Sequence, residues 1–381
     1  MSDRTIIPVD HPGTFIVEEL EERGWTQVDL AYILGITPQQ LSPILTGKLG
    51  ISPDMAVALG DAFDVPADFF ANLQKQYDLF KAKRPNPAVR ARANWLSVFP
   101  VREMIKRGWI DDSDDPSLLD LQMTRFFNKN RVEDIPFIGS GDVFPHAARK
   151  ADYSSVTAVQ YAWLHRVKKV AESLDCPPYS ADVLRQNLPR IRAHMQDKDD
   201  LIRIPEILRE SGVRFALVEA LPGSKIDGVC VWNEDQPVIG MTTRWDRLDN
   251  FCFVLRHECE HVLLGHGKEA TFMPVDEFDY DTNEQTGHPE EEIQANNAAS
   301  EFLVPRKQLE SFILRKSPFI SERDVLAFAA RIEINPAVVV GQIQHRTNNY
   351  AWLRKYQKSI RDYLMDWQCI DGWGHQAPTG L

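Results

Sequence analysis

The apolar segment Phe251–Leu264 constrains the fold of this 381-residue chain most strongly, because it holds a metal-binding motif on a helical pattern. Residues 257–261 read His-Glu-Cys-Glu-His, an H-E-x-x-H motif. Residues four apart share one helix face, so His257 and His261 can bind one metal ion. Glu258 lies beside any water on that ion, where a carboxylate can act as general base. Paired imidazoles suit Zn²⁺, which takes three protein ligands in hydrolytic sites.

A second segment, Glu290–Pro305, supplies candidates for the third ligand. It reads as a helix with an alanine-lined face that ends near the proline. Glu292 and Asn296 are one turn apart, so one can ligate while the other orients a ligand histidine. Glu291 stays an alternative ligand.

At these two segments the chain resembles the ImmA/IrrE metallopeptidases. In that family the H-E-x-x-H helix is followed by a helix of the form E-x-E-A-N/D-x-x-A-x-x-L-L-x-P. The residues that match the second pattern are Glu292, Ala295, Asn296, Ala299, Leu303 and Pro305. The chain departs from it at Gln294, where a second glutamate is usual, and at Phe302, where a leucine is usual. The resemblance covers about residues 201–305.

The resemblance implies a zinc peptidase with His257, His261 and Glu292 as ligands and Glu258 as the base. It implies one Zn²⁺ per chain, and Mn²⁺ or another divalent ion stays open. Asn296 would then orient one of the ligand histidines without binding the metal itself.

The residues around the motif predict a compact α+β core. A helix at Ile202–Ser211 is followed by three short β-prone runs at Val213–Glu219, Val229–Trp232 and Val238–Met241. An edge strand beside the metal could bind an extended substrate by strand addition. In the loop at residues 267–289, Tyr280 or His288 could stabilise the oxyanion of the tetrahedral intermediate. The alternative, that both residues belong to an ordinary surface loop, stays equally open. His266 could be a spare ligand, but a structural role is favoured because it lies off the ligand face.

The segment from His11 to about Phe80 predicts five short helices, the last at Pro66–Leu73, with a helix–turn–helix at its centre. It resembles the Cro/repressor-type domain in its HigA antitoxin form. The matching residues are His11-Pro12-Gly13, Glu18-Glu19-Leu20, Trp25-Thr26-Gln27, Asp29-Leu30-Ala31, Leu34-Gly35, Thr46-Gly47-Lys48 and Asn72-Leu73-Gln74. That family implies operator binding, usually as a homodimer. The predicted DNA contacts are Gln27, Thr37, Gln39, Gln40, Ser42, Thr46 and Lys48.

The charge of this first domain argues against simple DNA binding. Residues 1–80 hold four basic and twelve acidic residues, a net charge of −8. Residues 81–110 hold eight basic residues and one acidic residue, a net charge of +7. The basic segment could contact the phosphate backbone, or it could dock on the acidic domain.

The whole sequence therefore predicts a multidomain, mainly helical protein. Its predicted parts are a repressor-like helix-turn-helix domain at 1–80, a helical connector at 81–200 that is basic at its start, an α+β zinc-peptidase core with a three-stranded sheet at 201–305, and a C-terminal helical region at 306–381. No segment reads as membrane-spanning and the five cysteines are scattered, so a cytoplasmic protein is expected.

Two functions stay open. One is a DNA-binding transcription regulator with an intrinsic zinc endopeptidase, which cleaves a repressor or antitoxin in a stress, phage or toxin–antitoxin response. The other is a non-proteolytic HigA-like antitoxin and autorepressor with a toxin partner, whose metal domain only senses or binds.

Overall fold

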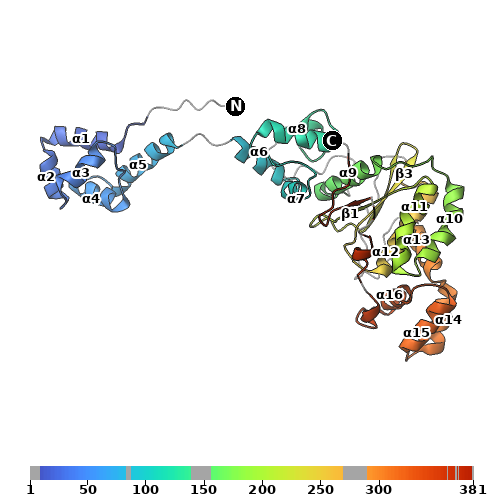
Figure 1. Ribbon diagram of the computed structural model, residues 1–381. Coiled ribbons are helices and arrows are strands. Elements are labelled where there is room, and N and C mark those ends of the chain that lie inside the picture. The colour runs from blue at the N-terminus through green and yellow to red at the C-terminus, as the bar shows by residue number, and fades with distance from the viewer. Residues whose placement is uncertain are drawn as a thin grey trace. The chain divides into compact units, whose positions relative to one another are not determined.

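The computed structural model describes residues 9–82, 87–138, 156–268, 290–357, 359–364, 367 and 369–379. The chain forms two compact units, Met1–Asn86 with one hydrophobic core and Pro87–Leu381 with two (Figure 1). The predicted class, mainly helical with a small sheet, is confirmed.

The first unit is a bundle of five helices around Ile16, Leu30, Leu41, Leu59 and Phe70. Its helices are α1 (Pro12–Arg23), α2 (Gln27–Ile33), α3 (Pro38–Leu45), α4 (Pro53–Phe63) and α5 (Ala67–Lys81). Threonines cap α2 and α3, each closing a capping box with the third residue of its helix.

Helix α5 is longer than the sequence suggested. The predicted helix ends at Leu73, whereas α5 continues to Lys81. Neither glycine nor proline interrupts it, and Gln74 donates to Asp78 one turn further on, at 2.8 Å. The side-chain carbonyl of Gln74 also accepts a hydrogen bond from the backbone N–H of Ile51. This bond connects the extension of α5 to the bundle.

The second unit is built on a four-stranded sheet of order β2-β3-β1-β4. Its strands are β1 (Arg214–Val218), β2 (Gly228–Asn233), β3 (Gln236–Met241) and β4 (Ile370–Asp371). Strand β1 runs parallel to β3 and β4, while β2 pairs antiparallel to β3. Among the described residues, β2 is therefore an edge strand.

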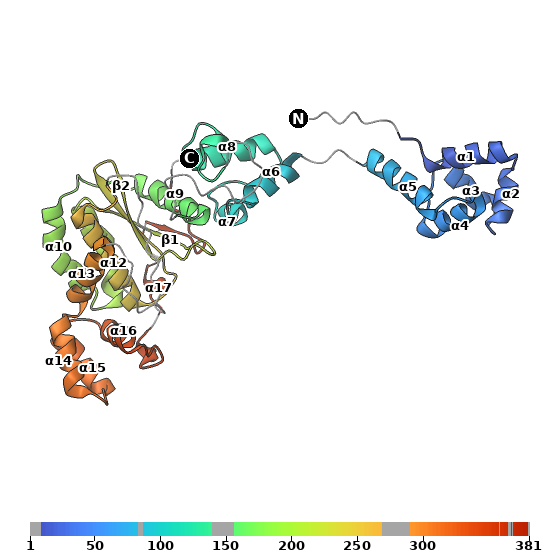
Figure 2. The same ribbon diagram turned by 180° about the vertical axis from the view of Figure 1, so that it is seen from behind.

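Helices cover both faces of this sheet, so its strands are buried on both sides (Figure 2). Phe215 and Leu217 point into one core, and Ala216 and Val218 into the other. The helices before the sheet are α6 (Pro87–Leu96), α7 (Val101–Lys106), α8 (Pro116–Phe126), α9 (Ala158–Glu172), α10 (Ala181–His194) and α11 (Ile204–Glu210), with short 3₁₀ turns at Val132–Asp134 and Lys198–Arg203. After the sheet come α12 (Leu248–Leu264), α13 (Glu290–Leu303), α14 (Arg306–Lys316), α15 (Glu322–Arg331), α16 (Pro336–Thr347), a 3₁₀ turn at Arg354–Tyr356 and α17 (Arg361–Leu364).

The fourth strand was not predicted, because it comes from a C-terminal region that reads as helical. Asp371 of β4 is 1% exposed and forms a buried ion pair with Arg166 of α9. The indole N–H of Trp109 also donates to Asp371, at 2.7 Å. These contacts fix the C-terminal segment in the core, although a run of two strand residues leaves no periodic pattern in the sequence.

The described helices give one finding about membranes. None is by itself long and apolar enough to cross one, and α15 and α16 reach that length and composition only as a pair bent by 117°.

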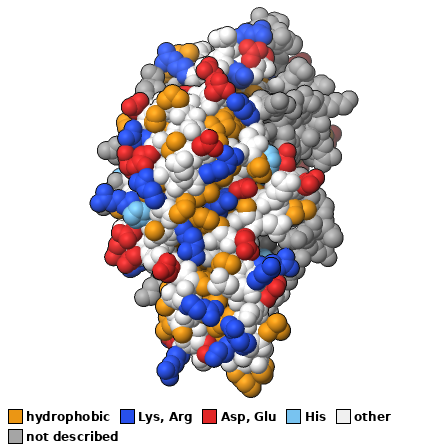
Figure 3. Space-filling view, turned by 90° about the vertical axis from the view of Figure 1, so that its right-hand side faces the viewer, with side chains coloured by type: hydrophobic (Ala, Val, Ile, Leu, Met, Phe, Trp, Pro, Cys, Tyr) orange, Lys and Arg blue, Asp and Glu red, His pale blue; other side chains and the backbone are white. Residues whose placement is uncertain are grey.

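On the face in Figure 3, basic and acidic side chains are interspersed among small apolar patches.

Candidate metal centre and nucleic-acid interface

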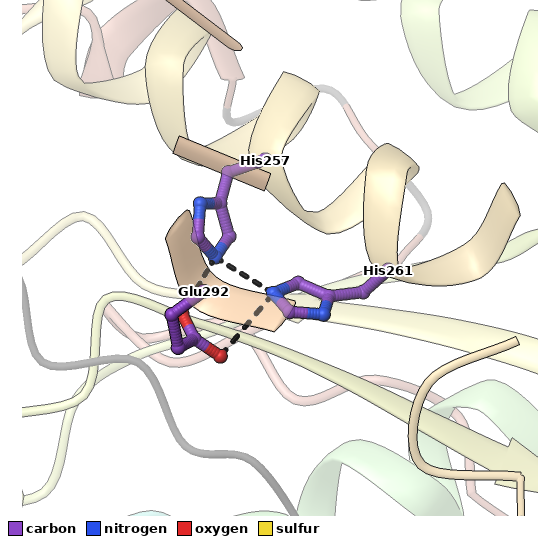
Figure 4. A group of neighbouring side chains, drawn as sticks. All are labelled: His257, His261 and Glu292. Carbon is purple, nitrogen blue, oxygen red and sulfur yellow. Dashed lines mark hydrogen bonds and ion pairs between the residues drawn. The ribbon is translucent and has the colours of Figure 1, made fainter. Parts of the chain in front are cut away.

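Helix α12 positions both histidines of the H-E-x-x-H motif. It is buried along most of its length and ends at Gly265, whose φ of 72° suits a left-handed cap. His257 and His261 are both 0% exposed. Their Nε2 atoms lie 2.9 Å apart and point to the same side of the helix (Figure 4).

Helix α13 brings a carboxylate to the same point. Its Ala295 and Ala299 are fully buried, which lets α13 approach α12 closely. Glu292 Oε2 lies 3.3 Å from His257 Nε2, and Glu292 Oε1 lies 3.4 Å from His261 Nε2 (Figure 4). The donor atoms of these three residues all lie within 4.8 Å of one another.

The spacing of these donors fits a zinc ion. Ligand atoms about 2.05 Å from a tetrahedral ion are separated by roughly 3.3 Å. The two distances from Glu292 match that edge, and the shorter distance between the imidazoles calls for a small adjustment. Glu291, the alternative ligand, is exposed on the first turn of α13 and is not part of the group.

Each histidine has a hydrogen-bond partner on its other ring nitrogen. His257 Nδ1 lies 3.1 Å from Asn296 Oδ1, and His261 Nδ1 lies 2.8 Å from His266 Nδ1. The amide oxygen can only accept, so His257 donates from Nδ1 and keeps the lone pair of Nε2 for an ion.

His266 therefore contacts His261, a member of the donor group, rather than joining that group. Gly265 turns the chain so that the N–H of His266 donates to the carbonyl of His261. Burial lowers the pKa of His266. The sequence showed a histidine five residues after the motif, but its partner depends on this turn.

Glu258 is 0% exposed and lies between α12 and the first residue of β2, Gly228. Cys259, between the two donor histidines in the sequence, is fully buried, and burial raises the pKa of its thiol to about 12. The two predicted oxyanion residues, Tyr280 and His288, lie outside the described residues.

In the first unit, the predicted DNA contacts are all exposed: Gln27, Thr37, Gln39, Gln40, Ser42, Thr46 and Lys48. They lie on α2, α3 and the turns at the ends of α3. Gln40 also closes the capping box, because its carbonyl accepts from the backbone N–H of Thr37 at 2.9 Å. A two-point contact from Gln40 to adenine would break that bond, whereas the side chain of Gln39 has no such role among the described residues.

Two known families match the chain, one in each of its two units. Residues 16–70 match the helix-turn-helix family, and residues 212–341 match the IrrE N-terminal-like domain. The chain joins a helix-turn-helix domain to an IrrE-like domain. The IrrE-like match starts just before β1 and ends inside α16, so it includes all three donors, while α6–α11 and β4 lie outside it.

The relatives found cover the helix-turn-helix domain. An uncharacterized HTH-type transcriptional regulator, YddM, from Escherichia coli is 31% identical over 81 residues, which are 21% of this chain and 86% of that protein. Virulence-associated protein A' from Dichelobacter nodosus is 40% identical over 18% of this chain, and the match spans 61% of that relative's length.

Solved structures give the same coverage. The antitoxin HigA of Pseudomonas aeruginosa, solved with the higBA promoter, is 34% identical over 23% of this chain and 87% of its own, with a TM-score of 0.19. A HigA-family antidote protein of Coxiella burnetii is 32% identical over 19% of this chain and 82% of its own, also with a TM-score of 0.19.

Proposed function

We propose that the IrrE-like domain is a zinc-dependent endopeptidase, and that the chain is a transcription regulator that cleaves a repressor- or antitoxin-type protein. The observation that carries this proposal is the convergence of His257, His261 and Glu292 within 4.8 Å. Two histidines and a glutamate are a ligand set of hydrolytic zinc, which keeps a fourth position for water or substrate. Free thiols at all five cysteines support a reducing cytoplasm as the site of action.

A zinc ion held by these residues would polarise a peptide carbonyl and make a nearby water more acidic. Glu258 would accept the proton of the attacking water and deliver it to the departing amine. Asn296 would hold His257 in the tautomer whose Nε2 faces the ion.

The edge strand β2 supports binding of an extended substrate. Its first residue, Gly228, contacts Glu258, so a segment added along the edge that no described strand pairs with would bring a peptide bond beside the base. A repressor or antitoxin that exposes a flexible linker offers such a segment.

The test is metal content together with cleavage by matched variants. We expect one divalent ion per chain in the wild type and in Glu258→Gln. We expect Glu258→Gln to lower kcat by roughly 10²- to 10⁴-fold, the usual contribution of a general base. Glu291→Gln, on the exposed neighbour of Glu292, is the control and should cleave normally. Protein without stoichiometric metal, or a fully active Glu258→Gln, would overturn the enzyme proposal.

We also propose that the helix-turn-helix domain binds operator DNA as a homodimer. Its exposed α2–α3 surface and its similarity to an HTH-type regulator support this. The net charge of −8 on residues 1–80 means that phosphate contacts must come largely from elsewhere, and residues 81–110 carry +7. Binding of the full chain to its own promoter, measured against salt, tests this. Absence of binding at low salt would refute it.

The alternative is a non-proteolytic HigA-like antitoxin and autorepressor. The similarity to the HTH-type regulator YddM supports this alternative. The match spans 86% of that protein, so the protein is little longer than a helix-turn-helix domain. A stable complex with a toxin, without cleavage of any partner, would select this function.

A further inference from the structure

Gly228 begins the edge strand β2 at the point where this strand meets α12. A Cβ atom added to Gly228 would overlap Oε1 of Glu258 and lie 3.0 Å from its Cδ. The other close neighbour of that Cβ is Val254 Cγ1, at 2.6 Å. The carboxylate of Glu258 therefore occupies the space that any other residue at position 228 would fill.

We propose that Gly228 is a positioning residue, which holds the Glu258 carboxylate against the edge strand by lacking a side chain. This inference rests on the proposed peptidase function, in which Glu258 is the base. Both residues are buried, so the carboxylate has little room to move elsewhere without a change in its neighbours.

The conformation of Gly228 does not itself require glycine. Its φ is not in the left-handed region, and a glycine inside a strand weakens it. Close approach by another group is the remaining reason for a glycine at this position, and the carboxylate is that group. The carboxylate is the end of a flexible side chain. A methyl at position 228 would therefore displace this carboxylate more readily than it would displace the backbone of β2.

The zinc ligands lie outside this contact. The atoms nearest to the added Cβ belong to Glu258 and Val254, and not to His257, His261 or Glu292. An alanine at position 228 should therefore leave the metal in place while it moves the base.

Gly240 of β3 provides a matched control in the same sheet. A Cβ there would meet Val167 Cγ1 at 2.6 Å and Val229 Cγ1 at 2.9 Å, so the position is also too crowded for a methyl, but by apolar groups on the other face. Gly240→Ala therefore measures the cost of a methyl in a buried strand without any contact to Glu258.

The experiment compares the full-length, zinc-loaded wild type with Gly228→Ala and Gly240→Ala. We expect Gly228→Ala to keep one zinc per chain and to lower kcat by at least about tenfold, with KM nearly unchanged, since a displaced base loses part of its 10²- to 10⁴-fold effect. Gly240→Ala should lose thermal stability but keep kcat. A Gly228→Ala enzyme with wild-type kcat would overturn the proposal.

Two further measurements separate displacement of the base from general strain. The double variant Gly228→Ala, Val254→Ala relieves the clash with valine and leaves the one with Glu258, so kcat should stay low. Recovery of kcat would assign the effect to Val254 instead. Crystal structures of the zinc-loaded wild type and of zinc-loaded Gly228→Ala give the comparison. In Gly228→Ala the carboxylate of Glu258 should lie further from β2 than in the wild type, and an unmoved carboxylate would contradict the inference. This structural result can be read even if the wild type cleaves nothing, so it separates failure of the positioning role from failure of the peptidase proposal.

Discussion

The chain carries two helix pairs with opposite surroundings. In α12–α13 the histidines are fully buried, and each is fixed by a hydrogen bond to a second side chain. In α2–α3 all seven predicted contact residues are exposed, and the hydrogen bonds of Thr37 and Gln40 serve to cap the helix. Packing therefore fixes the side chains of the first site within the chain, whereas at the second surface it fixes the helices and leaves the predicted contact side chains exposed.

This difference predicts where single substitutions act most strongly. Loss of a buried ligand should remove a whole function. Loss of an exposed contact should weaken one of several parallel interactions.

The largest effect is expected from His261→Ala. It removes one of the three proposed ligands and leaves a cavity beside His266, so bound zinc should fall below about a tenth of an ion per chain at micromolar protein. Metal analysis after dialysis measures it. His345→Ala, on the exposed end of α16, is the control and should keep full zinc. Equal zinc in both variants would show that the three donors do not form the site.

A smaller effect is expected from Asn296→Ala, which leaves the three proposed ligands intact but frees the ring of His257. Outer partners of ligand histidines typically contribute 10- to 100-fold in metal affinity, so a loss of about that size is expected in a zinc competition titration. Asn297→Ala changes the exposed neighbour on the same helix and should bind zinc as the wild type does. If the two variants bind zinc equally, the bond to His257 has no part in holding the metal.

The sequence was most informative where packing and periodicity coincide. The α12 and α13 helices could be predicted because their apolar or alanine-lined faces recur at helical spacing, and the motif residues lie at fixed positions on those faces. The close approach of Glu292 to the two histidines follows from the small alanine side chains of α13. These alanines are visible in the sequence, and in the structure Ala295 and Ala299 are buried.

The features that the sequence did not reveal depend on contacts between distant segments. Strand β4 has only two residues, and it is held by pairing with β1 and by the ion pair of Asp371 with Arg166, 205 residues away. The bond between His266 and His261 needs the turn at Gly265. The continuation of α5 to Lys81 is supported by Gln74, which bonds to Ile51.

On the exposed surface, Gln39→Ala should weaken operator binding by about 1–3 kcal/mol and relax the preference at one base pair. Lys48→Ala should instead weaken binding to all sequences alike and reduce the salt slope by about one. Anisotropy titrations with operator and unrelated DNA measure both. Lys75→Ala, on α5, is the control. The reverse pattern, with a sequence-specific loss at Lys48, would show that the domain is oriented differently on DNA.

The last effect concerns His165, a partly buried histidine outside both sites, and it separates burial from function. His165 packs against Phe127 and Tyr161, and burial together with Lys168, Lys129 and Lys169 lowers its pKa from 6.5 to about 3. Between these two values the unfolded chain binds the proton and the folded chain does not, so stability is lost as pH falls below 6.5.

We therefore expect the free energy of unfolding to drop by about 2 kcal/mol between pH 7 and pH 5 through this one residue. His165→Gln removes the titration and should flatten the curve in that window by the same amount, as measured by urea unfolding followed through tryptophan fluorescence. The metal site should be unaffected, since His165 is not among the three donors. An unchanged pH dependence in His165→Gln would mean that this imidazole is protonated in the folded chain, and that burial alone does not suffice to exclude a charge in this core.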